Sequence, residues 1–131
     1  MFLLKLHRCL ADETRLRVMH LLARGPLCVC HFQSVLATPQ VAVSKHLAYL
    51  RRHGLVDAQR HGQWMIYRLP SPCPVELKRQ LRCLLDSAAD IPALSADLKR
   101  LAKIKGECGW IGSVPPSPKN ANRASAAKSG K

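Results

Sequence analysis

The sequence predicts a mainly α-helical fold with one small β-hairpin, and three observations support this prediction. Apolar residues recur at helical spacing through most of residues 1–105. A single pair of short β-capable runs flanks a glycine-containing turn at His61 and Gly62. At 131 residues, with 47% hydrophobic and 22% charged residues, the chain has the size and composition of one globular domain rather than of a multidomain enzyme.

Three helices are expected in the N-terminal part of the chain. Residues 2–10 are mostly apolar with interleaved basic residues, which is typical of a short amphipathic helix. Asp12 is a good N-cap for a second helix, which Gly25 and Pro26 end. The apolar segment 27–36 is predicted to form the third helix.

A fourth helix is expected to begin at Thr38 and Pro39, with Thr38 as its N-cap and Pro39 at its first position. Gly54 ends this helix, and the hairpin follows it. Two further helices are expected over residues 75–88 and 93–103, separated by a proline. The apolar residues that recur on the buried face of the fourth helix are Val43, Leu47 and Leu50.

Two short helices joined by a tight connection and followed by a hairpin form a winged helix-turn-helix. In this fold the second helix of the pair enters the DNA major groove, and the hairpin, or wing, touches the backbone beside it. We therefore expect residues 1–105 to form a DNA-binding and dimerisation domain. Residues 106–131 are rich in Gly, Pro, Ser and Ala and are expected to form a flexible basic tail. No apolar run approaches the roughly 18–20 residues of a membrane span, so no membrane is expected among the partners.

The net charge of +13, from 21 Lys and Arg against 8 Asp and Glu, predicts attraction to a polyanion such as double-stranded DNA. Polar side chains near the start of the fourth helix suit base edges, and those of the wing suit phosphates or the minor groove. Arg51 and Arg52 are further candidates for phosphate contact, whereas Trp64, Ile66 and Tyr67 are expected to pack within the hairpin. The candidate DNA-binding residues are Thr38, Gln40, Val41, Ser44, Lys45, Arg60, His61, Gln63 and Arg68.

Two of the six cysteines, Cys28 and Cys30, stand one residue apart. The chain shows no secretion signal, so a cytoplasmic location with free or metal-binding thiols is expected, and so tight a pair should make a poor disulfide. Thiolates select soft ions. Side chains at i and i+2 lie about 200° apart on an α-helix but on the same side of an extended segment. Binding one ion through both sulfurs therefore requires a non-helical or distorted start to the third helix.

The segment LADETRLRVMHLLARGPLCVCHF resembles the opening helices and the L-C-V-C metal box of the ArsR/SmtB family of bacterial metalloregulatory repressors. The segment VAVSKHLAYLRRHGLVDAQRHGQWMIYRL resembles the recognition helix and wing of the same family. Together the two segments cover about residues 3–70, and the Cys-Val-Cys sequence is most similar to the arsenic-sensing branch. The resemblance implies a non-enzymatic repressor that leaves its operator when trivalent arsenic or antimony binds Cys28 and Cys30. Cd²⁺ is a further candidate inducer, and no other cofactor is expected.

The sequence departs from the commonest pattern of that branch at two positions. Gln33 stands where a third cysteine is usual, and His31 stands where an aspartate is usual. The candidates for a third ligand are Cys108, Cys9, water or an exogenous thiol, while His31 is a weaker candidate that would suit zinc. Residues 75–104 contain no histidine, so the zinc site that other branches carry on the dimer helices is not expected.

The N-terminal helix and the two C-terminal helices are apolar on one side and lie outside the DNA-reading unit. Pairing these faces predicts a homodimer, and two recognition helices about one turn of DNA apart predict an imperfect palindrome as operator. Two alternatives remain open. The chain could be a winged-helix regulator whose cysteines are structural and sense no metal. A thiol redox protein is less favoured, because the sequence has no C-x-x-C motif or βαβ pattern.

Overall fold

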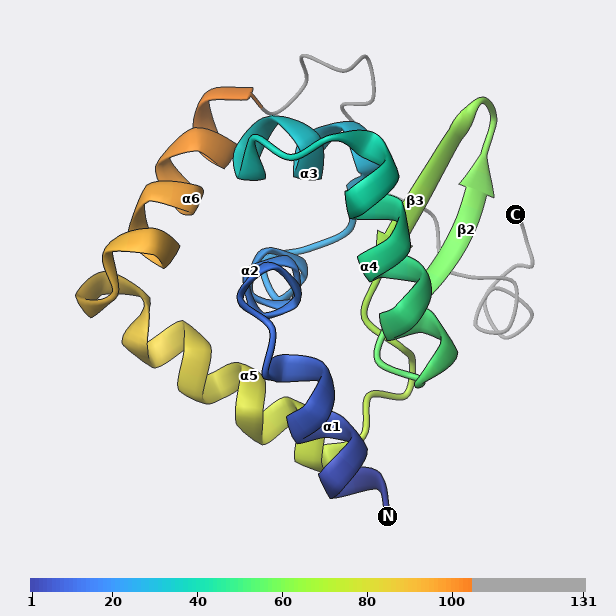
Figure 1. Ribbon diagram of the computed structural model, residues 1–131, viewed down its shortest axis with the longest axis vertical. Helices are drawn as coiled ribbons and strands as arrows, with labels where there is room; N and C mark the ends of the chain where they lie inside the picture. The colour runs from blue at the N-terminus through green and yellow to red at the C-terminus, as the bar shows by residue number, and fades with distance from the viewer. Residues whose placement is uncertain (105–131) are drawn as a thin grey trace.

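The computed structural model describes residues 1–104, and Figure 1 shows how their elements are arranged. The prediction of a mainly α-helical fold with a wing hairpin is confirmed. The expected tail and Cys108 lie outside the described residues. Within residues 1–104, no helix is both long enough and apolar enough to cross a bilayer. The elements are α1 (Phe2–Leu10), α2 (Glu13–Leu22), β1 (Leu27–Cys28), α3 (Val29–Leu36), α4 (Gln40–Arg52), β2 (Asp57–His61), β3 (Trp64–Arg68), α5 (Val75–Ser87), the 3₁₀-helix η1 (Ala88–Asp90) and α6 (Pro92–Ile104).

Helix α2 lies at the centre of the molecule, and Figure 1 looks along its axis with the other helices around it. Five consecutive residues of α2, from Val18 to Leu22, are buried. Because five consecutive helical positions cover the whole circumference, this end of α2 is enclosed on every side. The main apolar core forms around it, and the helix-turn-helix pair α3 and α4 packs against this core.

The starts of the helices confirm one predicted cap and correct another. The Arg15 amide donates to the Asp12 carboxylate at 3.0 Å, so Asp12 caps α2 as predicted. Helix α4 instead has Pro39 at its N-cap, and the Thr38 hydroxyl donates to the Leu36 carbonyl oxygen at 2.9 Å. The prediction that Thr38 caps α4 is therefore wrong. Its hydroxyl satisfies a carbonyl left over at the end of α3, where Ala37 turns the chain with a φ of +50°.

The buried face of α4 is the predicted one. Val43, Leu47 and Leu50 are all fully buried. These three side chains attach the helix to the core and leave its opposite face free, which is the arrangement that a DNA-reading helix requires.

The wing belongs to a three-stranded antiparallel sheet in the order β1-β3-β2. The hairpin is the predicted one, and Gly62 adopts a φ of +65° in its turn. Strand β1 was not expected, because segment 27–36 was predicted to be helical throughout. A two-residue strand carries no periodicity from which to detect it. Its pairing of Leu27 with Tyr67 and of Cys28 with Ile66 ties the segment before α3 directly to the wing.

A buried ion pair attaches α6 to the centre of the molecule. Arg17 of α2 donates through Nε and Nη2 to the two carboxylate oxygens of Asp97, at 2.8 and 2.7 Å. The Asp97 side chain is fully buried, and this bidentate bond raises the pKa of Arg17. Arg100 donates to Asp97 at 3.4 Å and to the Val35 carbonyl oxygen at 3.3 Å. Helix α6 is thereby connected to both α2 and α3.

Candidate thiolate site and nucleic-acid interface

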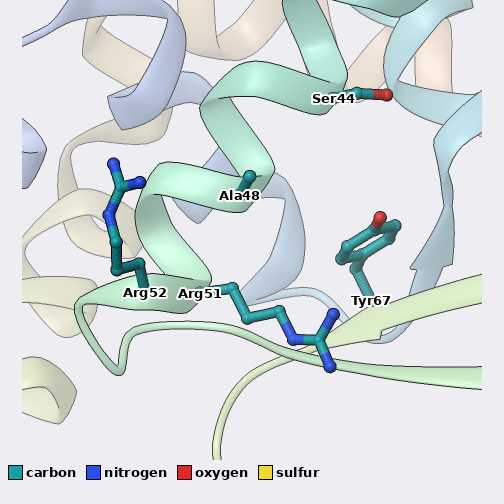
Figure 2. A pocket seen from close by; sticks show the side chains of 5 residues that line it. All are labelled: Ser44, Ala48, Arg51, Arg52 and Tyr67. Atoms are coloured by element: carbon teal, nitrogen blue, oxygen red, sulfur yellow. The ribbon is translucent and has the colours of Figure 1, made fainter.

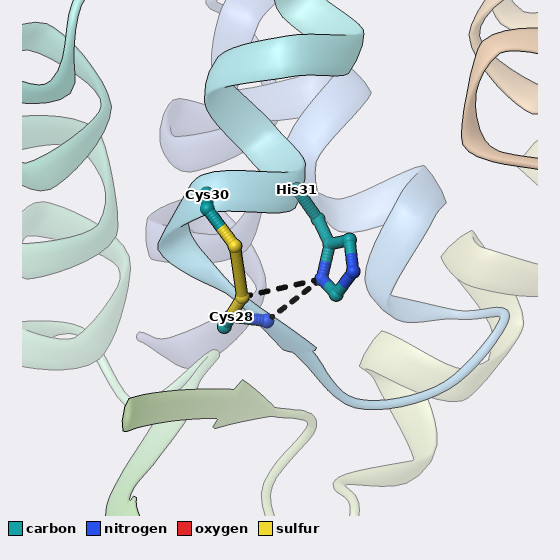
Figure 3. A group of neighbouring side chains, drawn as sticks. All are labelled: Cys28, Cys30 and His31. Carbon is teal, nitrogen blue, oxygen red and sulfur yellow. Dashed lines mark hydrogen bonds between the residues drawn. A yellow bond between two sulfur atoms is a disulfide. The ribbon is translucent and has the colours of Figure 1, made fainter. Parts of the chain in front are cut away.

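The junction between β1 and α3 carries the two neighbouring cysteines (Figure 3). Cys28 is the last residue of β1 and the N-cap of α3, with extended backbone angles of φ −93° and ψ 167°. Cys30 lies in the first turn of α3. The third helix therefore begins with the non-helical residue that two sulfurs on one ion require. No distortion of α3 is needed to bring them together.

The structure joins the sulfurs of Cys28 and Cys30 in a disulfide. The expectation that so tight a pair makes a poor disulfide stays a prediction. Because Cys28 is extended, the two Cα atoms lie 5.5 Å apart. This separation falls within the range of about 4.4–6.8 Å that disulfides ordinarily span. The same proximity places the two sulfurs where the reduced pair can share one ion.

His31 lies beside the two sulfurs, as Figure 3 shows. Its Nδ1 accepts the Cys28 amide proton at 3.2 Å and lies 3.4 Å from the Cys28 Sγ. The three possible ligand atoms of Cys28, Cys30 and His31 all lie within 4.8 Å of one another. Cys28 and His31 are buried, and Cys30 is half-buried. We call these three residues the junction cluster.

Of the described candidates for a third ligand, His31 lies beside the two cysteines and Cys9 does not. His31, the weaker candidate from sequence, is the described residue that the structure brings to the cysteines. Cys9 is fully buried in the main core, where burial raises the pKa of its thiol, and it is not part of the junction cluster. His31 could not be ranked higher from sequence because its place depends on a helix start in which Cys and His replace the usual Ser or Thr and Glu.

The junction cluster also touches the wing. Cys28 and Ile66 form a small buried cluster, and Cys30 and Trp64 pack against it. Ile66 and Trp64 belong to β3 and were expected to pack within the hairpin, whereas the structure packs them against two cysteines that lie outside it. A change at the two sulfurs can therefore reach both α3 and the wing.

The outer face of α4 and the tip of the wing present the predicted DNA-binding side chains. Gln40, Val41 and Lys45 are exposed on α4, and Val41 is 69% exposed although it is apolar. Ser44 on the same helix is half-buried. On the wing, Arg60 and Gln63 are exposed and His61 is half-buried. These positions remain predictions of DNA contact.

A notch separates α4 from the wing (Figure 2). Its volume is about 380 Å³, and it is lined by Ser44, Ala48, Arg51, Arg52 and Tyr67. In Figure 2 the Arg51 side chain extends toward Tyr67, whereas Arg52 extends away from it. The Arg52 guanidinium instead lies 5.4 Å from the centre of the Tyr49 ring. The sequence suggested both arginines for phosphate contact and did not separate them, nor did it place Tyr67 here.

Arg68 lies on the other face of β3. Successive side chains of a strand point to opposite faces, so Arg68 and Tyr67 cannot line the same surface. Arg68 donates to the Gln59 side-chain oxygen at 3.2 Å, and burial lowers the pKa of its guanidinium. It lines a separate pocket of about 250 Å³ together with residues that include Gly25 and Pro26. Its contact with DNA remains a prediction.

Comparison with known proteins places this arrangement in a family. Residues 12–58 match the family described as "Bacterial regulatory protein, arsR family". Over 112 residues the chain is 40% identical to the Arsenic resistance transcriptional regulator ArsR1 of Pseudomonas putida, an alignment that covers 85% of this chain and 80% of that protein. The chain belongs to the ArsR family.

Two other similar proteins agree with this assignment. The Arsenical resistance operon repressor of Escherichia coli is 43% identical over 72 residues, which cover 54% of this chain and 62% of that protein. The homodimeric winged helix-turn-helix DNA-binding domain of Mb0332 from Mycobacterium bovis, described as a possible ArsR-family regulator, has a TM-score of 0.55 and 27% identity. That comparison covers 68% of this chain and 79% of the Mycobacterium domain. This ArsR-family chain is therefore a winged helix-turn-helix protein, as the sequence predicted.

Proposed function

We propose that this ArsR-family chain is a transcriptional repressor that leaves its operator when trivalent arsenic or antimony binds Cys28 and Cys30. The observation that carries the proposal is the position of the two sulfurs. They lie side by side at the junction that connects β1 to α3, and this junction contacts the wing. The names of the similar arsenic-resistance regulators support the choice of ion.

The chemistry requires the dithiol form of the pair. A phosphine reductant cleaves the disulfide to two thiols and itself takes up the oxygen of one water molecule to become a phosphine oxide. Arsenous acid then condenses with the two thiols, so that two As–S bonds form and two water molecules leave. Soft thiolate ligands favour such an ion over hard cations.

The coupling to DNA binding follows from what the junction contacts. Helix α3 packs against the recognition helix α4, and β1 is paired with β3 of the wing. An ion that favours one arrangement of the junction shifts the relative positions of α4 and the wing. If that arrangement differs from the DNA-bound one, ion binding and DNA binding oppose each other by the same free energy.

The proposed repressor acts as a homodimer. Leu3 and Leu4 of α1 are 41% and 52% exposed, and Val75 of α5 is 51% exposed. A dimer through the N- and C-terminal helices would cover such apolar side chains. It would also place two α4 helices about one turn of DNA apart, which predicts an operator with imperfect palindromic symmetry.

The decisive experiment measures fluorescence anisotropy of labelled DNA from upstream of the chain's own gene, with and without arsenite, on phosphine-reduced protein. Arsenite should release the labelled DNA from the wild-type protein. Cys28→Ser and Cys30→Ser should bind the DNA but resist release. Cys83→Ser is the matched control, because Cys83 is an exposed free cysteine on α5, and it should respond as the wild type does. DNA binding that arsenite leaves unchanged in the wild type would instead support a winged-helix regulator without metal sensing.

A further inference from the structure

We propose that a hollow beside α5 is a second ligand site, which binds a small amphipathic carboxylate of the fatty-acid class. The hollow has a volume of about 440 Å³. This volume lies in the range of about 300–1,000 Å³ that small-molecule sites span. We call it the α5 hollow. Its lining includes neither the junction cluster nor the candidate DNA-binding residues, so the inference does not rest on the proposed function.

Apolar side chains form one part of the α5 hollow. Leu81 is 4% exposed and belongs to the main core, and the half-buried Leu69 and Leu85 line the hollow with it. An alkyl chain that covers these side chains removes apolar surface from water. Each methylene buried there should tighten binding by up to about fourfold.

The charged side chains that line the α5 hollow are both cations. Lys78 and Arg82 are exposed and stand four positions apart, so they are neighbours on one side of α5. Neither takes part in a salt bridge within residues 1–104, and the described lining includes no acidic residue. Like charges at this spacing repel each other. One carboxylate beside both cations would offset this repulsion, so the charge of the hollow favours an anionic ligand.

Cys73 shows that the apolar and cationic parts of the α5 hollow lie close together. It is a half-buried free cysteine that lines the hollow. Burial raises the pKa of its thiol, and the charge of Lys78 opposes this effect. The Lys78 ammonium therefore lies within electrostatic reach of a thiol that is partly withdrawn from water. An alkyl chain with one negative end matches this change of surroundings over a short distance.

The position of the α5 hollow connects its occupant to the wing. Leu69 directly follows β3, and Ala23, which also lines the hollow, directly follows α2. A bound ligand therefore contacts the base of the wing, the end of the central helix and α5 together. The chain beyond Glu107 carries basic residues and no acidic one, so its charge does not suit the two cations.

The thiol of Cys73 provides the readout of occupancy. Full-length protein is alkylated with iodoacetamide at increasing submicellar concentrations of decanoate, and site-resolved mass spectrometry follows each cysteine. Cys83 is the internal control, because it is an exposed free cysteine of α5 that does not line the hollow. The test variant combines Lys78→Gln with Arg82→Gln. Arg79→Gln is the matched control, because it removes an exposed positive charge of α5 outside the hollow.

Decanoate should slow the alkylation of Cys73 to a plateau and leave that of Cys83 unchanged. Octanoate should require a higher concentration, by up to about fourfold for each of its two missing methylenes. Decanol has the same chain without the charge and should protect Cys73 less well. The double variant should need about fivefold more decanoate, which is the scale of an exposed charge pair. Arg79→Gln should behave as the wild type does, and circular dichroism establishes that each variant is folded.

Three results would overturn the inference. Equal protection by decanol and decanoate, or unchanged protection in the double variant, would show that the cations bind no carboxylate. Protection of Cys83 together with Cys73 would show that decanoate coats the surface without a site. A Cys73 that is unreactive without decanoate and becomes reactive on dilution would show that a second copy of the chain covers the hollow.

Discussion

Arg51 and Arg52 are neighbours in sequence, but their side chains point in different directions. Arg51 extends along the notch toward Tyr67, and Arg52 lies over Tyr49 (Figure 2). The notch opens between the recognition helix and the wing, where a winged-helix protein meets the DNA backbone. We therefore predict a phosphate contact for Arg51 and a packing role against Tyr49 for Arg52.

Arg51→Ala should weaken DNA binding about equally on specific and nonspecific sequences. It should also reduce the slope of log K against log salt by about 1.8, the value of two lost phosphate contacts, one from each subunit of the proposed dimer. Arg52→Ala is the matched control and should leave the slope unchanged. The measurement is a salt series of anisotropy titrations. Equal slope changes in the two variants would contradict the assignment.

His20 is a second residue whose surroundings matter, because burial determines the protonation state of its ring. It is fully buried in α2, and its Nδ1 has no hydrogen-bond partner among the described residues. Burial lowers the pKa of His20, and the charge of Arg24 adds to this effect while Asp97 opposes it. The ring is therefore held neutral inside the core.

Because His20 binds a proton less well in the folded protein than in the unfolded chain, protonation of this ring favours unfolding. The free energy of unfolding should therefore fall as the pH drops below the unfolded pKa of about 6.5. His20→Gln should lose less stability than the wild type between about pH 7.5 and about pH 5.5. Urea unfolding at the two pH values measures this difference. The exposed His7→Gln is the control and should follow the wild type. An unchanged pH dependence in His20→Gln would contradict the prediction.

Among the elements, α6 is attached by polar as well as apolar contacts. Its Asp97 receives two hydrogen bonds from Arg17, and the Asp97 side chain is fully buried while that of Arg17 is 19% exposed. Arg100 adds a longer contact, and its side chain is 53% exposed. Breaking a buried pair leaves a charge without its partner, whereas an exposed pair contributes little.

Asp97→Ala should therefore lower the free energy of unfolding by about 3 kcal/mol. Arg17 then stays largely buried and keeps only a longer contact of 3.7 Å with the exposed Glu13. Arg100→Ala should cost less than about 1 kcal/mol. Urea unfolding of both variants, with Arg17→Ala and the double variant to complete a cycle, measures the coupling. A smaller loss in Asp97→Ala than in Arg100→Ala would contradict this view of α6.

The elements also show what sequence can and cannot predict here. The long helices and the hairpin were predictable, since positions such as Val43, Leu47 and Leu50 repeat with the helical period. Strand β1 was not, because its two residues are strand only through pairing with β3. The two cysteines were identified from spacing, but the place of His31 beside them depends on that same strand. The notch lies between α4 and β3, so it could not be predicted without knowing how these two elements pack.

At the scale of the whole molecule, we predict that the exposed apolar residues of α1 lie in the interface of the proposed dimer. Leu4→Glu would bury a charge in the proposed dimer interface, so this variant should sediment as a monomer and bind operator DNA more weakly. Leu4→Met conserves volume and polarity and should remain dimeric. Analytical ultracentrifugation measures the difference. A dimeric Leu4→Glu variant would place the interface elsewhere.

The strand order has a consequence for how far the proposed switch could move. Strand β3 is the middle strand, and β1 covers one of its two sides. If ion binding pulled β1 away entirely, β3 would show a row of bare amides and carbonyls, which can recruit another chain and lead to aggregation. A repressor that binds and releases its ion repeatedly would avoid this risk if β1 only rotated slightly and kept its hydrogen bonds to β3. In the proposed sensor, the two-residue strand β1 would therefore limit how far ion binding can move the junction.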